Sequence, residues 1–210
     1  MINANADAMG IIFPNNYDKF VPELVSERLM ASIPFASRYR MIDFLLSSMV
    51  GCGIDKIEVL VRENYHSLVD HLGGGREWDL SRKNGGLSIF PPFAQKSIGS
   101  MGGGRVEALA NILPVLKKQK EKYVIMADTN IAANFDFNAL IAQHVKTDAD
   151  ITFAYTKEEL PQELTGAKDA SKGLYYTLKL DGDKVEDIYI NKQEQGVQNF
   201  SMNIYIANRE

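Results

Sequence analysis

Short apolar runs alternate with amphipathic stretches along the first three quarters of the chain. Ala8–Phe13, residues 57–61 and residues 123–127 are almost continuously apolar, as is typical of strands that are buried on both faces. Residues 41–50, 105–120 and 138–146 have helical spacing instead. We therefore expect an α/β fold, in which a mostly parallel, mixed sheet carries helices on both faces.

The longest predicted helix, over residues 105–120, has its apolar residues on one helical stripe, of the kind that packs on a core. These residues are Val106, Leu109, Ala110, Leu113 and Leu116. Lysines at positions 117, 118 and 120 place positive charge where it would complement the carboxyl end of the helix dipole.

The last third of the chain has a different pattern. Residues 175–180 and 185–190 flank the sequence DGDK, which predicts a β-hairpin. Residues 201–207 predict one more strand. The polar stretch 158–172 contains Pro161 and Gly166, so we expect an exposed loop there.

Composition narrows the class of protein. The 210 residues are 45% hydrophobic and 24% charged, with a net charge of −4, so there is no basic footprint for nucleic acid or an anionic membrane. No apolar run approaches the ~20 residues that span a bilayer. Cys52 has no cysteine partner, and we expect a cytoplasmic protein.

His66, His71 and His144 lack the spacing of a metal site or a nucleophile–base pair, so structural roles are expected.

Several motifs occur in an order that brings one family to mind. They are IPFASRYRMIDFLLS at 33–47, HLGGG at 71–75, WDL at 78–80, EAL at 107–109 and SMNIY at 201–205. Together they resemble the bacterial glucose-1-phosphate adenylyltransferases, also called ADP-glucose pyrophosphorylases. No single motif is specific, but the set covers most of the chain.

The resemblance implies a Rossmann-like nucleotidyltransferase domain over residues 1–210. Enzymes of that family form ADP-glucose and pyrophosphate from ATP and glucose 1-phosphate in bacterial glycogen synthesis. It also implies dependence on Mg²⁺, assembly into tetramers and a C-terminal left-handed β-helix, for which this chain has no residues.

The positions that carry the family's chemistry have lost their charges or glycines. Aligned without gaps, the phosphate-binding Gly-Gly-x-Gly-x-Arg loop falls on residues 15–20, and the Gly-Asp-His motif falls on residues 129–131. In the loop, Asn15, Asn16 and Asp18 stand where the family has glycines, and Phe20 stands where it has arginine. Met30 replaces a lysine, and Asn130 replaces the metal-binding aspartate. Ile190 and Asn191 replace the Glu-Lys pair that binds the sugar phosphate. Each altered position removes a group that would balance phosphate or hold Mg²⁺.

Some residues remain candidates for ligand binding. They are Lys19, Arg28, Arg38, Arg40, Gly103, Gly104 and Glu107. Arg38 and Arg40 either contact a nucleotide or form an ion pair with Asp43 or another subunit. The glycines cover an active site or only mark a turn. Asp128, at the end of a predicted strand, is a candidate Mg²⁺ ligand, although capping a turn or facing solvent explains it equally simply.

The loss of charges beside an intact scaffold resembles the second, GlgD-type subunit that accompanies the catalytic subunit in Gram-positive bacteria. The first hypothesis is therefore an accessory, regulatory subunit whose partner is the catalytic subunit of glucose-1-phosphate adenylyltransferase. The second is a working nucleotidyltransferase with rearranged ligands. The third is a module that binds a sugar phosphate or nucleotide without chemistry.

Overall fold

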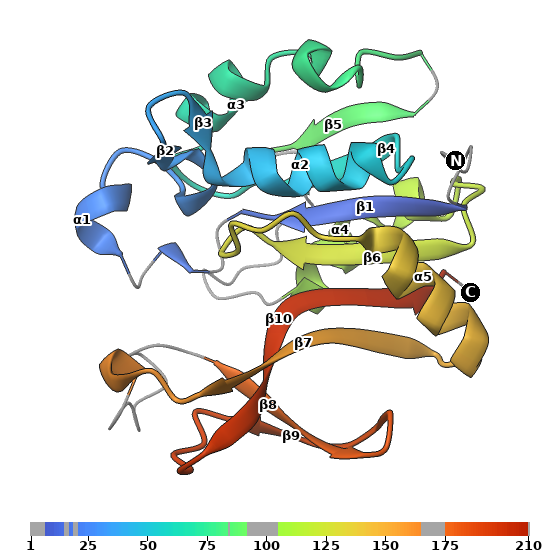
Figure 1. The fold of residues 1–210 in the computed structure, drawn as a ribbon. Helices are drawn as coiled ribbons and strands as arrows, with labels where there is room; N and C mark the ends of the chain where they lie inside the picture. Colours follow the sequence, from blue (N-terminus) through green and yellow to red (C-terminus); the bar gives the residue numbers. More distant parts are fainter. Residues whose placement is uncertain are drawn as a thin grey trace. The chain divides into compact units, whose positions relative to one another are not determined.

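The computed structural model describes residues 7–14, 17–18, 21–83, 85–91, 105–164 and 175–209. The elements, in chain order, are β1 (Ala8–Phe13), α1 (Pro22–Val25), η2 (Met30–Ser32), β2 (Pro34–Phe35), β3 (Tyr39–Arg40), α2 (Met41–Gly51), β4 (Lys56–Leu60), α3 (His66–Leu72), η3 (Arg76–Trp78), β5 (Gly86–Phe90), α4 (Arg105–Leu116), β6 (Tyr123–Asp128), α5 (Phe137–Thr147), β7 (Ile151–Glu159), η5 (Gln162–Leu164), β8 (Tyr176–Asp181), β9 (Lys184–Ile190) and β10 (Val197–Asn208) (Figure 1).

The chain divides into two compact units. Unit 1 consists of Met1–Thr152 and Ile206–Glu210, and unit 2 of Phe153–Tyr205. Strands β7 and β10 contribute residues to both units. The candidate residues named above fall in both units.

Unit 1 contains the predicted parallel sheet, with strands in the order β5-β4-β1-β6 and the end of β10 beside β6. Strand β1 pairs in parallel with β4 on one side and with β6 on the other. Helices α2 and α5 lie on one face of this sheet, and α4 lies on the opposite face (Figure 1). The predicted class, a mostly parallel mixed sheet with helices on both faces, is confirmed.

Successive residues of β1 point to opposite faces of the sheet and so pack against different helices. Met9, Ile11 and Phe13 belong to one buried cluster with Ala108 and Ile112 of α4. Gly10 points to the other face, where an added Cβ would lie 2.7 Å from Sδ of Met49 on α2. The sequence Ala8–Phe13 is apolar throughout because both faces of the strand are covered.

Local side-chain contacts fix where the main helices on one face begin. The Asp43 carboxylate accepts a hydrogen bond from the backbone N–H of Arg40 at 3.0 Å, and this contact is part of a capping box at the start of α2. At the start of α5, Asp136 accepts from the N–H of Ala139 at 3.1 Å. These contacts hold both helices close to their predicted bounds.

Unit 2 contains the predicted hairpin, formed by β8 and β9 around the sequence DGDK. Asp181 pairs with Lys184, so Gly182 and Asp183 form the turn, and Gly182 takes a φ of +58° that suits glycine. Strand β8 also pairs antiparallel with β10, and β7 pairs with β10. The predicted final strand is confirmed but is longer, since β10 begins at Val197.

Three expectations about the region from α4 to β7 need correction. Helix α4 ends at Leu116, so the three lysines lie beyond its last turn, and its buried residues are Ala108 and Ile112. The predicted stripe is only partly right: Leu109 and Leu116 pack against the core cluster, but Val106 is 80% and Leu113 is 45% exposed. Strand β7 continues to Glu159, into the stretch that we expected to be a loop.

Among the described residues, no helix is long and apolar enough to cross a membrane.

Candidate functional site

The order of strands in the unit 1 sheet indicates where a ligand would bind. The expected position is at the carboxyl ends of the parallel strands, which we call this edge of the sheet. The chain proceeds from β1 to β4 and β5 on one side, and then crosses to β6 on the other side of β1. In open α/β sheets, ligands bind at the carboxyl ends of the strands where the order reverses in this way. The edge formed by the ends of β1 and β6 is therefore the candidate site.

A buried ion pair lies at the end of β6. Asp128 is the last residue of this strand and is completely buried. Its two carboxylate oxygens accept hydrogen bonds from Nε and Nη2 of Arg105, the first residue of α4, with Nε 3.2 Å from Oδ1. The Arg105 side chain is 25% exposed. The bidentate geometry neutralises Asp128 with a cation from the chain itself.

The next residues of this edge are neutral and largely buried. Thr129 is 2% exposed, and its hydroxyl donates to the carbonyl of Pro14, just after β1, at 3.4 Å. Oδ1 of Asn130 is buried and has no hydrogen-bond partner in the part of the chain that the structure describes. Asn130 can offer an amide oxygen to a ligand, but no charge.

Asp18, in the predicted phosphate loop, bonds back to the polypeptide. Its Oδ1 accepts from the backbone N–H of Met30 at 2.8 Å, at the start of η2. The carboxylate that we expected in the phosphate region is thus bonded to the backbone at the start of η2. Asn15, Asn16, Lys19, Phe20, Gly103 and Gly104 lie outside the described residues.

The described residues at this end of the sheet do not fit the Mg²⁺ that the resemblance implies. Mg²⁺ is usually held by one or two carboxylates together with substrate phosphates and water. Here both oxygens of Asp128 face a guanidinium, and Asn130 is neutral. Over the described ranges there is no group of three or more His, Cys, Asp or Glu residues that could hold a metal ion. This geometry argues against Asp128 as a metal ligand.

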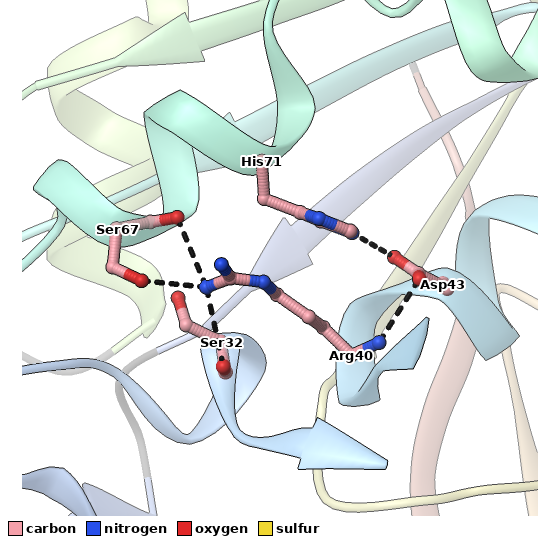
Figure 2. A network of polar contacts seen from close by, with 5 residues as sticks. All are labelled: Ser32, Arg40, Asp43, Ser67 and His71. Carbon is pink, nitrogen blue, oxygen red and sulfur yellow. Dashed lines mark hydrogen bonds and ion pairs between the residues drawn. The ribbon is translucent and has the colours of Figure 1, made fainter. Parts of the chain in front are cut away.

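Arg40 is held inside a polar network that joins α2, α3 and η2 (Figure 2). Its Nη1 donates to the carbonyl of Ser67 at 3.1 Å, to Oγ of Ser67 at 2.5 Å and to the carbonyl of Ser32 at 3.3 Å. Asp43 instead contacts the backbone N–H of Arg40 and Nε2 of His71, the latter at 2.7 Å. The side chain that contacts the Asp43 carboxylate is therefore that of His71, not the Arg40 guanidinium as we expected, and the guanidinium is held by Ser67 and Ser32 instead.

The other candidates on unit 1 lie at different exposures. Arg38 is exposed on the turn between β2 and β3, where Ala36 and Ser37 have φ values of +46° and +70°. Arg28 is half-buried beyond α1, and its side chain makes no ion pair with any described residue. Glu107 is half-buried in the first turn of α4. The structure does not bring these three residues into a common contact.

The positions matched to the sugar-phosphate pair lie in unit 2. Ile190 ends β9 and is 59% exposed. Asn191 has a φ of +51°, and its Oδ1 accepts from the N–H of Tyr175 at 3.1 Å. One residue is apolar and the other shapes a turn, so neither supplies charge to a phosphate.

Sequence reasoning missed Arg105 as a site residue. The signal was available in the topology, because a helix that follows a parallel strand begins at the same edge at which the next parallel strand ends. An arginine that opens α4 and an aspartate that closes β6 therefore meet, although they lie 23 positions apart.

Comparisons with known proteins place the chain in a family. Residues 23–167 match the nucleotidyl transferase family. The chain is 36% identical over 151 residues to the glycogen biosynthesis protein GlgD of Geobacillus stearothermophilus, covering 70% of this chain and 43% of that protein. It is 33% identical over 187 residues to the glucose-1-phosphate adenylyltransferase of Clostridium novyi, covering 88% and 46%.

A solved structure supports the fold at greater distance. A protein from Bacillus anthracis described as a glucose-1-phosphate thymidylyltransferase, in complex with sucrose, superposes with a TM-score of 0.69 at 13% identity, covering 96% of this chain and 72% of that one. The chain spans less than half the length of the curated relatives named above. With a family match over most of its length and the corresponding sheet, the chain belongs to the nucleotidyl transferase family.

Proposed function

We propose that this chain acts in glycogen biosynthesis as an accessory, regulatory subunit of glucose-1-phosphate adenylyltransferase, with its own transfer chemistry impaired. The observation that carries the proposal is the ion pair in which Arg105 neutralises Asp128, at the end of the sheet where ligands bind in such folds. The similarity of the chain to GlgD proteins supports the same proposal. Similarity to adenylyltransferases supplies the partner class.

The physical reason is electrostatic. Phosphoryl-type transfer depends mainly on positioning and on neutralising the charge of the phosphates. Removing a single stabilising donor typically lowers the rate about 10²–10³-fold. Met30, Asn130, Ile190 and Asn191 all lack the charge that the family's chemistry needs, so little turnover should remain.

The first test uses the purified protein alone with ATP, glucose 1-phosphate and Mg²⁺. Pyrophosphate release should not exceed that of a no-protein control. Turnover that Asp128→Ala lowers would support the rearranged-ligand alternative instead, and would overturn the proposed loss of activity.

The second test measures whether the protein associates with a catalytic subunit and changes its activity. The full-length form of this protein is co-expressed with a glucose-1-phosphate adenylyltransferase catalytic subunit, and ADP-glucose synthesis is compared with the catalytic subunit alone. Co-purification with a change in kcat, substrate affinity or effector response is expected. Unchanged kinetics and no co-purification would refute the accessory role.

A further inference from the structure

The Arg105–Asp128 pair has the features of a replacement for a metal ion. A carboxylate that is completely removed from water is strongly destabilising unless a positive charge compensates it. At the end of β6 the compensating charge is the guanidinium of Arg105, which engages both carboxylate oxygens. Among the described residues, Asp128 belongs to no group of three or more His, Cys, Asp or Glu side chains that could hold a metal ion.

The charge balance of this pair differs from that of a metal site. A divalent cation on one carboxylate leaves one unit of positive charge to balance a phosphate, whereas a guanidinium on one carboxylate leaves none. The neighbouring Thr129 and Asn130 are neutral, so they do not restore the difference. Polyphosphates therefore gain little electrostatic attraction from the pair.

We propose that the Arg105 guanidinium is a built-in counter-ion that takes the electrostatic place of a divalent cation at the end of β6. Asp128 is thereby charge-balanced without metal, and Nε and Nη2 of Arg105 are engaged by this carboxylate rather than by an anion. The pair acts in this way whether the chain is an accessory subunit or an enzyme, so an active protein would refute the proposed function and leave this proposal standing.

The central test compares wild type, Arg105→Met and the double variant Arg105→Met/Asp128→Asn, with Mn²⁺ as a spectroscopic probe. The titration is done with inorganic pyrophosphate present, because one carboxylate holds such an ion together with phosphate oxygens. Electron paramagnetic resonance should then give a Kd for Mn²⁺ at this site that is at least about tenfold lower in Arg105→Met than in the wild type. The Tm of Arg105→Met should fall and be partly restored by Mg²⁺, but not by NaCl of equal ionic strength.

The double variant is the matched control, because it removes both charges and leaves no buried carboxylate. Its Tm should lie closer to that of the wild type, and Mg²⁺ should not change it. The converse variant Asp128→Asn releases Arg105, and its affinity for inorganic pyrophosphate should rise about tenfold over wild type in calorimetry. This variant keeps the proposal testable if Arg105→Met does not fold.

Three results would overturn the proposal. One is Mn²⁺ binding to the wild type as tight as to Arg105→Met. Another is a folded Arg105→Met protein that loses stability without binding Mn²⁺, which would leave the pair a purely structural contact. The third is an Asp128→Asn protein that binds pyrophosphate no better than wild type.

Discussion

Glu58 of β4 is a buried acid within the parallel sheet of unit 1. It is 3% exposed, and its Oε2 has no hydrogen-bond partner within the described part of the chain. Burial raises the pKa of this carboxyl above its ordinary value, against smaller opposing effects of a hydrogen bond from Ser88 and the charge of Lys56. The folded state therefore holds the Glu58 proton more tightly than the unfolded chain does.

The pH dependence of stability follows from the sign of that shift. Stability from this group is fully present below the ordinary pKa of 4.5, and it is lost as pH rises through the raised folded-state pKa. Glu58→Gln, which cannot ionise, should therefore increase the free energy of unfolding by about 1 kcal/mol at neutral pH. Urea unfolding across pH should show this gain shrinking in acid. The exposed Glu23→Gln is the control, and an equal gain there would contradict the burial argument.

Arg40 gives a second prediction at the level of one residue. Arg40→Ala removes three hydrogen bonds that connect the β3–α2 junction to α3 and η2, and it should lower the free energy of unfolding by about 2 kcal/mol. The exposed neighbour Arg38→Ala should change it by less than about 0.5 kcal/mol. Urea unfolding of both variants measures the difference. Equal effects would mean that the network in Figure 2 contributes no stability.

The roles of single residues were only partly predictable from sequence. Structural roles for His71 and His144 could be expected from their isolation, and the structure gives each a hydrogen-bond partner, Asp43 for His71 and Thr152 and Asn208 for His144. The partner of Asp128 could not be found from local sequence, because it comes from another element. Only the parallel topology brings the two together.

Helix α4 shows why a helix can be located correctly while its buried face is predicted only in part, since Leu109 and Leu116 face the core but Val106 and Leu113 do not. Its helical spacing admits two apolar stripes, one through Val106 and Leu113 and one through Ala108 and Ile112. Periodicity identifies a helix but does not choose between such stripes. The sheet makes the choice, since the cluster around Met9 and Ile11 receives Ala108 and Ile112.

This orientation predicts losses of very different size for two similar truncations in α4. Ile112→Ala leaves a cavity against the sheet and should cost about 3 kcal/mol of unfolding free energy. Val106→Ala, at a residue that is 80% exposed, should cost less than about 0.5 kcal/mol. Chemical denaturation of both variants distinguishes the two stripes. A larger loss for Val106→Ala would restore the stripe expected from sequence.

Strands were more predictable than helix faces because their signals are local. The apolar run of β1 and the DGDK turn between β8 and β9 are each specified within a few residues. The extension of β7 to Glu159 depends on its pairing with β10, about fifty positions further along the chain, so local polarity gave a loop instead.

At the scale of the molecule, local stability should differ among strands. All six residues of β1 are buried, whereas β9 is mostly exposed. Amide hydrogen exchange should therefore be slowest in β1 and in the strands paired with it, β4 and β6, and faster in β9. Mass spectrometry of peptic fragments can compare the strands directly. Protection of β9 equal to that of β1 would contradict this ranking.

The buried ion pair has a consequence for how this lineage can evolve. Losing Arg105 alone leaves a fully buried Asp128 carboxylate without its counter-charge, and removing one partner of a buried pair typically costs about 3–5 kcal/mol. Natural domains have only about 5–15 kcal/mol to lose. Losing Asp128 alone is less costly, because the Arg105 side chain is 25% exposed and its guanidinium can reach water. The order of substitution therefore matters at this contact: Asp128 can change first and Arg105 afterwards, whereas the reverse order passes through a destabilised protein.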